Sequence, residues 1–467
     1  MHVAALAALV AGMHVAGCSA SDDHAPTGRQ PATGSRDGGA ATAPGTGTDP
    51  IPSGNADSGP GGGPGAPSCV GLRCDVPRCP AGVTTSVSGV VHAPTRVDPE
   101  PLPNVSVYVP NAPLDAFPTE IACEGCDGFL TGDPIAHVLS APDGTFTLED
   151  VPAGKDVPLV IQSGRWRRRV TIPEVSPCRD TVLPDELTRL PRNQGEGDIP
   201  SMALQTGIVD ALECTLAKIV DVAELTAPSG SGRIHLYKGN GADASPSLPD
   251  AGTLLGDPAK LRGYDVVLLP CDFDTPTTPM ISAAAIANLM AYADAGGRLF
   301  LTHGGGKWLK ETVPAPYPGL IQFNMQPDPA SPLPALVDTS FPKGEVFADW
   351  LVVVGVSAVR GELAIDAPQW YVDSVSAPAQ RWVHSTTPPT MQHFTFNVPL
   401  AQGPDSEPCG RVLYSNFHVR PPPANAVFPG ACPPLDEPLT ANEKIVLFML
   451  FDTTACVQPD EDPIGPT

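Results

Sequence analysis

Short apolar runs separated by polar, Gly- and Pro-rich segments recur along the chain, and the clearest case is residues 263–309. The apolar run Val266–Leu269 has the length and composition of a fully buried strand. A segment with apolar residues at helical spacing, including Ile286 and Leu289, follows it, and Arg298–Leu301 reads as a second buried strand. Strand–helix–strand crossovers build parallel sheets, so this region predicts the centre of an α/β domain.

The pattern places further elements of that domain on both sides of this centre. Apolar spacing predicts a helix over 208–220 and a strand over 233–237, and a core strand returns at 410–419. Thr440 and Glu443 form a capping-box pattern ahead of a helix over 444–451. We therefore expect the α/β domain to span 200–457, followed by a tail over 458–467.

Regular β/α alternation is lost between these parts. Residues 311–345 are rich in Pro, and 346–399 carry strand-like runs at Trp350–Val356, Trp382–Ser385 and Phe394–Val398. We interpret 311–399 as a β-rich insertion in the α/β domain.

An alternating pattern earlier in the chain predicts a small β-sandwich over 69–190. Val87–Val91 and Val105–Val109 are short strand-like runs, and Asp143-Gly144 beside alternating apolar residues indicates a hairpin. The basic cluster Arg165–Arg169 lies between apolar residues, so we expect a strand and turn with arginines on a solvated face.

The first 68 residues have the composition of an export signal and a spacer. Residues 3–17 are small and apolar, and residues 19–67 contain almost no large apolar side chain. The second stretch cannot offset the entropy cost of folding, so 18–68 is predicted to be a disordered tether. The signal is assigned to 1–17, and it is too short for a spanning helix followed by a domain.

Charge excludes some partners. The 467-residue chain has 51 acidic and 27 basic residues, for a net charge of −24. So acidic a chain is a poor candidate for binding nucleic acid through charge.

Two resemblances refine the domain predictions. Val15-Ala16-Gly17-Cys18 resembles a bacterial lipobox, which implies cleavage before Cys18 and its acylation; the alternative is a secretory signal without a lipid. The Ser88-Gly89-Val90-Val91 opening, the Pro142–Phe146 hairpin and Pro152-Ala153-Gly154 resemble the carboxypeptidase regulatory-like domain. That likeness implies an immunoglobulin/transthyretin-like β-sandwich and no peptidase activity.

The later strands resemble another family. The order strand, helix, strand with the closing Gly410–Tyr414 strand is similar to class I glutamine-amidotransferase-like and trehalose-utilisation-like domains, which implies a flavodoxin-like parallel sheet. The whole chain also resembles a group of myxobacterial exported proteins of unknown role, through phrases such as Trp166-Arg167-Arg168 and Leu190–Gln194. The expected fold class is therefore multidomain, with a β-sandwich followed by an α/β domain.

Candidate chemistry lies at the ends of the predicted strands. Cys271, His303 and His418 each follow such a strand, and ligands of open α/β sheets bind at the carboxyl ends. A histidine near Cys271 could activate the thiol. Cys271 lacks the flanking glycines of an amidotransferase nucleophile, however, and no late His-x-Glu occurs, so the family triad does not transfer. The competing interpretation makes Cys271 structural, with Cys214 as its disulfide partner.

The cysteines otherwise read as disulfides of an exported protein. Eleven of the twelve cysteines remain after Cys18, and an odd number leaves at least one thiol unpaired or paired between chains. Cys123 and Cys126 are spaced like half a zinc site, but the second close pair is absent. Asp272 and Asp274 beside the histidines are weak evidence for a metal, and no cofactor or metal site is predicted. The disulfide candidates are Cys69, Cys74, Cys79, Cys123, Cys126, Cys178, Cys214, Cys271, Cys409, Cys432 and Cys456.

Two function classes follow. The first is a lipid-anchored protein of the bacterial cell envelope that binds an envelope protein or glycan through a degenerate amidotransferase-like domain, without turnover. The second is a hydrolase or acyl- or amide-transferring enzyme that uses Cys271, His303 and His418. The second class requires these three side chains to lie close together.

Overall fold

The computed structural model describes residues 69–126, 129–244, 247–272, 282–310, 317–400, 408–419 and 427–466. These residues belong to one compact unit, Pro67–Thr467. The predicted signal 1–17, the tether 18–68 and the lipidation candidate Cys18 lie outside the described residues.

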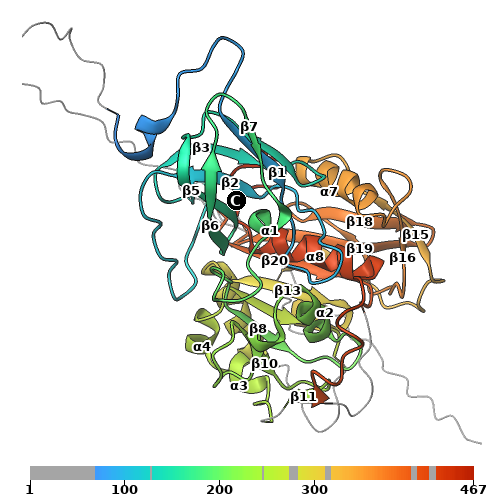
Figure 1. Ribbon diagram of the computed structural model, residues 1–467. Coiled ribbons are helices and arrows are strands. Elements are labelled where there is room, and N and C mark those ends of the chain that lie inside the picture. Colours follow the sequence, from blue (N-terminus) through green and yellow to red (C-terminus); the bar gives the residue numbers. More distant parts are fainter. Residues whose placement is uncertain are drawn as a thin grey trace, which may run out of the picture. The chain divides into compact units, whose positions relative to one another are not determined.

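Two small sheets make up the N-terminal part (Figure 1). Their inner faces share one core, to which Val87 and Phe146 contribute from one sheet and Val107 and Ile161 from the other. Asp143-Gly144 makes the predicted turn, with Gly144 at φ +76°. The three-stranded sheet has the order β4 (Thr145–Leu148), β1 (Ser86–Val90), β7 (Asp180–Val182), and the four-stranded sheet the order β3 (Pro134–Leu139), β2 (Ser106–Pro110), β5 (Gly154–Ser163), β6 (Trp166–Val175).

A ten-stranded sheet organises the rest of the described residues (Figure 1). Its strands from β9 to β20 are parallel, and the four that follow β20 across the sheet are antiparallel. The spatial order is β9 (Leu225–Thr226), β10 (Ile234–Tyr237), β8 (Met202–Gln205), β12 (Val266–Leu269), β13 (Arg298–Thr302), β20 (Gly410–Ser415), β19 (Pro389–Val398), β18 (Gln380–Thr386), β15 (Leu333–Val337), β16 (Glu362–Ile365).

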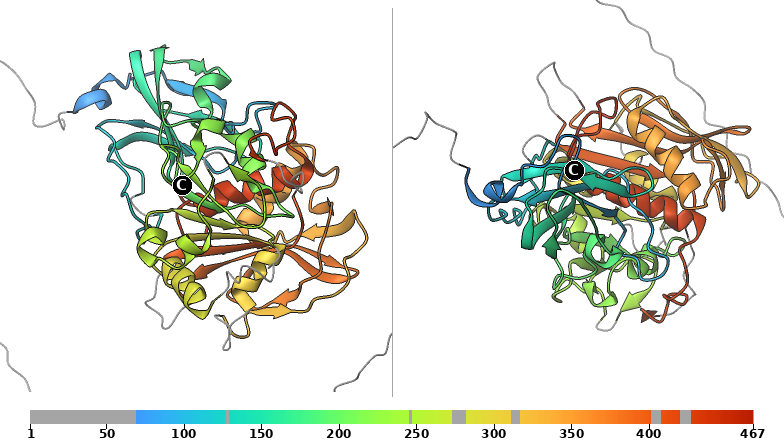
Figure 2. Two further views of the ribbon diagram at one scale, coloured as in Figure 1. Left: turned by 90° about the horizontal axis from the view of Figure 1, so that it is seen from below. Right: turned by 45° about the horizontal axis from the view of Figure 1, so that its top comes forward.

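Helices cover both faces of this sheet (Figure 2, left). Alternate residues of each strand face opposite sides, so Phe300 of β13 joins one core while Leu299 and Leu301 join the other. Helices α2 (Leu212–Ile219), α7 (Pro342–Val353) and α8 (Ala441–Thr454) contribute to the first core, and α3 (Gly252–Leu255), α4 (Pro258–Arg262) and α5 (Ala283–Asp294) to the second. The parallel strands flanked by helices that the sequence predicted for this domain are therefore present.

Shorter elements complete the described chain. They are η1 (Gly71–Asp75), α1 (Asp185–Thr188), η2 (Val222–Glu224), β11 (Asp243–Ala244), η3 (His303–Gly306), α6 (Lys307–Lys310), β14 (Ile321–Phe323), β17 (Val372–Val375) and β21 (Val427–Phe428).

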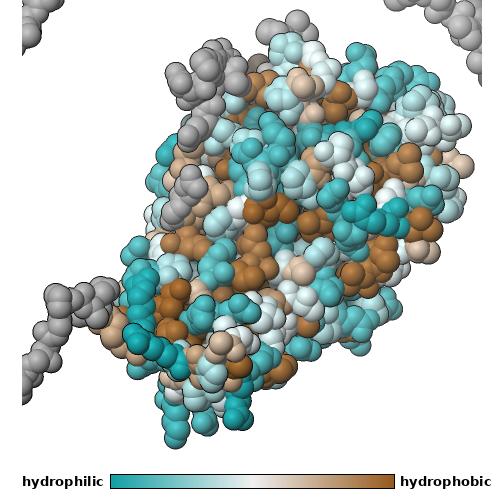
Figure 3. Space-filling view, turned by 90° about the horizontal axis from the view of Figure 1, so that it is seen from above, coloured by the Kyte–Doolittle hydropathy of each residue, from teal (hydrophilic) through white to brown (hydrophobic). Residues whose placement is uncertain are grey.

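The surface mixes residue types. On the face drawn in Figure 3, hydrophobic residues lie in small patches between hydrophilic ones. Among the described residues, no helix combines the length and apolar character that crossing a membrane requires.

One expectation about residues 311–399 needs correction. Trp350–Val356 was predicted as a strand, but Pro342–Val353 is helix α7. Pro342 suits the first helical turn, and Phe347, Trp350 and Leu351 lie three and four residues apart on the buried side, so packing overrides the β preference of the valines. Within this stretch, β15, β16, β18 and β19 extend the main sheet in antiparallel fashion, whereas β14 and β17 pair with each other in a separate two-stranded sheet.

The predicted solvated face of the basic cluster is also wrong. Arg165 and Arg167 are buried, and only Arg169 of the cluster is exposed. Arg165 Nη1 lies 2.6 Å from Asp265 Oδ1 and its Nη2 2.8 Å from Glu124 Oε1. Asp265 directly precedes β12, so the β5–β6 hairpin of the small sheets is joined to the amino end of the central strands. Ion pairing with acidic partners, which the sequence pattern did not reveal, makes this burial possible.

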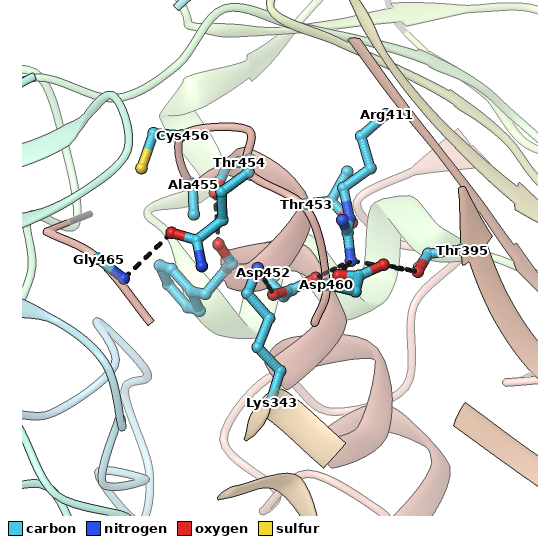
Figure 4. A network of polar contacts seen from close by, with 12 residues as sticks. Lys343, Thr395, Arg411, Asp452, Thr453, Thr454, Ala455, Cys456, Asp460 and Gly465 are labelled. Atoms are coloured by element: carbon cyan, nitrogen blue, oxygen red, sulfur yellow. Dashed lines mark hydrogen bonds and ion pairs between the residues drawn. The ribbon is translucent and has the colours of Figure 1, made fainter. Parts of the chain in front are cut away.

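The amino ends of β13 and β20 carry two further buried arginines. Arg298 donates only to backbone oxygens, including those of Gly296 and Cys409. Arg411 forms ion pairs with Asp452 and Asp460, at 3.0 and 2.8 Å, and Lys343 pairs with Asp452 at 2.7 Å (Figure 4). The buried charge of Arg411 is thus paired, and that of Arg298 is hydrogen-bonded to backbone oxygens, which offsets the cost of burial. The segment predicted as a tail supplies Asp460.

Ten cysteines of the described residues form disulfides, and Cys271 is free. The proposed Cys214–Cys271 bond is wrong, because Cys214 of α2 bonds Cys432 while Cys271 lies at a strand end. Cys123 and Cys126 do not pair with each other but hold the C-terminal half of the chain. The bonds are Cys69–Cys74, Cys79–Cys178, Cys123–Cys409, Cys126–Cys456 and Cys214–Cys432.

Candidate functional site

Four neighbouring parallel strands are each followed by a residue whose side chain can bind a metal or exchange a proton, and these residues lie at the same edge of the sheet. The strands are β8, β12, β13 and β20, which are adjacent and in register. Asp210 follows β8, Cys271 follows β12, His303 follows β13 and His418 follows β20. The carboxyl ends of parallel strands therefore bring residues as far apart in sequence as Asp210 and His418 into one cluster.

Cys271, His303 and His418 lie within reach of one another. The distance from Cys271 Sγ to His303 Nδ1 is 3.2 Å. The imidazole rings of His303 and His418 meet edge to face, with 4.9 Å between their centroids. One ligand atom from each of the three side chains lies within 4.8 Å of the others. The three candidates that the sequence placed at strand ends are thus brought together.

Asp210 holds this cluster from behind. Its side chain is completely buried, and its Oδ1 lies 3.3 Å from His418 Nδ1. The Thr302 hydroxyl donates to Asp210 Oδ2 at 2.5 Å, and the Val419 N–H donates to Oδ1 at 2.8 Å. The Cys271 N–H in turn donates to the Thr302 hydroxyl. Backbone and side chain of three strand ends are therefore tied to one carboxylate.

His303 occupies a strained turn between β13 and the following helical segment. Its φ is +24°, an uncommon value for a residue with a side chain. A Cβ at Gly304 would lie 2.9 Å from Cys271 Sγ, so only glycine permits the turn to approach the thiol this closely. The Tyr414 hydroxyl donates to the His303 carbonyl oxygen at 2.9 Å. Strain of this kind persists where the surroundings over-determine it, and it clusters at functional sites.

The electrostatics keep the Cys271–His303 pair uncharged. Burial raises the pKa of the Cys271 thiol to about 12, and the nearby Asp210 carboxylate adds to this effect. Burial lowers the pKa of the His303 imidazole to about 4, and the neighbouring His418 adds to the lowering. At neutral pH the pair is therefore a thiol beside a neutral imidazole, not a thiolate–imidazolium pair.

Exposure within the cluster is uneven. Cys271 is 0 % exposed, whereas His303 and His418 are of intermediate exposure. The two imidazoles consequently stand between solvent and the thiol.

Asp272 does not join this cluster. Its Oδ2 accepts hydrogen bonds from Gln205 Nε2, at 2.8 Å, and from the Asn240 N–H, at 3.2 Å. The carboxylate thus serves to connect β8 and the segment after β10. Asp274, the other carboxylate considered from the sequence, lies outside the described residues.

Two hollows lie away from this cluster in the described part of the molecule. One of about 320 Å³ is lined by Arg165, Arg233 and Asp265, near the amino ends of the strands. Another, of about 640 Å³, is an open groove lined by Arg381 and His384 of β18 and neighbouring residues. Neither is lined by the strand-end cluster.

Asp210 is the member of the cluster that sequence reasoning missed. The four-residue strand β8 was not predicted, and a helix was expected from residue 208, whereas α2 begins at Leu212. The apolar run Met202–Leu204 was the available signal, since it places the following polar residues at a strand end.

No protein-family model and no curated protein matches the chain. Among solved structures, a cytoplasmic protein from Salmonella typhimurium is 12% identical, with 54% of this chain and 98% of that chain covered and a TM-score of 0.30. A ThuA-like protein from Bacteroides uniformis is 13% identical, with 46% and 80% covered and a TM-score of 0.26. A type II cohesin–X-dockerin complex from Acetivibrio cellulolyticus is 15% identical, with 29% and 85% covered and a TM-score of 0.17. These scores are too low to carry an argument.

Proposed function

We propose that this chain is an exported, lipid-anchored envelope protein that binds a ligand at the Cys271–His303–His418 edge of its sheet, and that it is not a working amidotransferase. The observation that carries the proposal is the burial of Cys271: its thiol is fully buried beside His303, and this burial raises the thiol pKa. Covalent catalysis by cysteine needs the thiolate. A neutral pair behind two partly exposed imidazoles suits binding.

Export and anchoring rest on two features. Five disulfides in the described residues suit an oxidising compartment, where such bonds persist. The lipobox-like Val15–Cys18 stretch supplies the anchor, and acylation of Cys18 would attach the domain to the membrane. The expected partner is an envelope protein or glycan, because the anchor would place the chain in the cell envelope.

The anchoring half is tested by metabolic labelling with a palmitate analogue in a bacterial host. We expect label and membrane association for the full chain, and loss of both in Cys18→Ser. Cys69→Ser is the matched control, because it removes a cysteine without touching the signal. Equal labelling of Cys18→Ser and the parent chain would overturn lipidation at Cys18.

A second candidate function is an acyl- or amide-transferring enzyme with Cys271 as nucleophile. The 3.2 Å contact between Cys271 Sγ and His303 Nδ1 favours it, since a base within hydrogen-bond reach is the arrangement such enzymes use.

Alkylation of native, unreduced protein across pH separates the two functions. A binding site predicts that Cys271 reacts slowly until the protein is unfolded, with no plateau near neutral pH. Fast alkylation near neutral pH, lost in His303→Asn, together with hydrolysis of amide or thioester substrates, would establish the enzyme and remove the binding proposal. Asparagine is chosen because it tolerates the positive φ at this position.

A further inference from the structure

We infer that Cys271, His303 and His418 form a three-ligand site for a zinc-like divalent cation, with Asp210 orienting His418 from outside the coordination shell. The inference rests on the proposed binding function and specifies the ligand of that same site.

The donor set is the first argument. A thiolate and two imidazoles are the ligands that zinc prefers, and three protein ligands from three separate strands leave a fourth position for water or for a second ligand. His303 and His418 are partly exposed, so a metal ion can reach the cluster from solvent. Cys271 is fully buried and is the innermost of the three ligands.

The distances are the second argument. In tetrahedral zinc sites the metal lies about 2.0–2.1 Å from nitrogen and about 2.3 Å from sulfur, which separates ligand atoms by roughly 3.4–3.6 Å. The ligand atoms of the three side chains lie within 4.8 Å of one another, and the Sγ–Nδ1 pair is already at 3.2 Å. Side-chain adjustments of about an ångström would therefore complete the geometry.

The surroundings of His418 are the third argument. Ligating histidines ordinarily direct their second ring nitrogen toward a carboxylate, which sets the tautomer and the ring orientation. Asp210 Oδ1 lies 3.3 Å from His418 Nδ1, within ion-pair distance although the contact is not aligned as a hydrogen bond. His418 Nε2 is then the nitrogen left for a metal. The hydrogen bonds from Thr302 and Val419 hold Asp210 in this role.

Metal binding at this site also releases a proton. The thiol proton of Cys271 leaves to solvent when the sulfur binds the cation, and no oxidation or reduction takes place. One proton per metal bound is expected from Cys271, and zinc affinity should rise with pH.

The test uses the full exported chain, purified without a histidine tag and with disulfides intact. After exposure to zinc or cobalt alone and removal of free metal, we expect one equivalent of metal by elemental analysis. The cobalt form should show intense visible bands of tetrahedral coordination and a sulfur-to-cobalt charge-transfer band in the near ultraviolet. Cys271→Ser should lose that charge-transfer band and bind at least ~100-fold more weakly.

Three further variants define the site. His418→Gln should weaken zinc binding as strongly as Cys271→Ser, whereas Asp210→Asn should cost ~10–100-fold and keep the charge-transfer band, because Asp210 only positions a ligand. His384→Gln on β18 is the matched control and should leave binding unchanged. If a variant fails to fold by circular dichroism, the remaining ligand variant decides the matter through its affinity.

Two outcomes would overturn the inference. One is no metal uptake by the folded parent chain. The other is uptake that Cys271→Ser and His418→Gln leave unaltered, which would place the metal elsewhere. Absence of metal combined with slow alkylation of Cys271 would leave the broader binding proposal standing, whereas fast alkylation with turnover would remove both.

Discussion

The two ends of the same strands are built in opposite ways. At their amino ends, β13 and β20 carry Arg298 and Arg411, whose charges are paired or hydrogen-bonded inside the protein. At their carboxyl ends the same strands lead to His303 and His418, which form an incomplete polar cluster with Cys271. The ion pairs at the amino edge support the fold, whereas the side chains gathered at the carboxyl edge are of the kinds that bind a ligand.

At the amino edge of the sheet, a disulfide bond and the packing of the β5–β6 hairpin add to these ion pairs. Cys123–Cys409 holds the segment before β20, and Arg165 of the β5–β6 hairpin pairs with Asp265 before β12. At the hairpin tip, a Cβ on Gly164 would lie 1.7 Å from the Thr454 oxygen, so the hairpin presses directly against the end of α8. The amino edge is therefore closed by other parts of the chain, and polar residues there serve stability.

The largest loss of stability is expected when a buried ion pair at the amino edge of the sheet is removed. Arg411→Met would leave Asp460 without its buried ion-pair partner and Asp452 with Lys343 alone, and we expect the free energy of unfolding to fall by about 3–5 kcal/mol in urea denaturation. Arg360→Met is the control, because its pair with Asp349 is exposed and should contribute less than about 1 kcal/mol. Similar losses in both variants would contradict the assignment of the amino edge as structural.

Removing the Cys123–Cys409 disulfide should cause the second largest loss of stability. Cys123→Ala with Cys409→Ala opens a bond that spans 286 residues, and we expect a loss of about 2–5 kcal/mol. The paired control, Cys69→Ala with Cys74→Ala, opens a bond that spans 5 residues and should cost less, since the closed loop is short. Denaturant unfolding of both proteins measures the difference. An equal cost would indicate that the long bond does not constrain the unfolded chain.

A pH profile distinguishes buried acids with and without partners. Glu213 of α2 is buried with neither oxygen hydrogen-bonded in the described structure, and burial raises the pKa of its carboxyl to about 8. The folded state then holds a proton that the unfolded state releases above about pH 4.5. Stability should therefore fall between about pH 5 and pH 8, by ~1.4 kcal/mol per pH unit from this group.

Glu213→Gln should remove that slope, while Glu149→Gln on the exposed surface should keep it. Asp452 behaves in the opposite sense: although burial opposes ionisation, Lys343 and Arg411 lower the pKa of its carboxyl. Its contribution is present at neutral pH and is lost as pH falls. Urea unfolding at several pH values measures both, and an unchanged slope in Glu213→Gln would contradict the role given to this carboxyl.

The smallest effect on stability is expected at the open edge. His418→Gln removes an imidazole that makes no hydrogen bond through Nδ1 and is partly exposed, so the free energy of unfolding should change by less than about 1 kcal/mol. The same variant should lose most zinc affinity. A loss of several kcal/mol without metal would mean that His418 is part of the structural core.

Local pattern was enough to predict the parallel centre of the α/β domain. Val266–Leu269, the following helix and Arg298–Leu301 were predicted from apolar runs, and the capping box at Thr440–Glu443 is present at the start of α8. Strand ends then indicated Cys271, His303 and His418 as a cluster. These inferences succeeded because strand burial and helix capping depend on neighbouring residues.

Tertiary contacts decided the rest. The valines of Trp350–Val356 favour a strand by themselves, yet they end a helix whose other side packs into the core. The basic cluster Arg165–Arg169 was predicted to lie on the surface, yet Arg165 and Arg167 are buried and pair with the carboxylates of Asp265 and Asp198. Cys271 is the free thiol, and Cys214 bonds Cys432, which lies 218 residues further along the chain. The sequence by itself determined which segments are apolar strands and helices, and only the assembled sheet determined which charges and cysteines find partners, because pairing depends on distances between residues far apart in the chain.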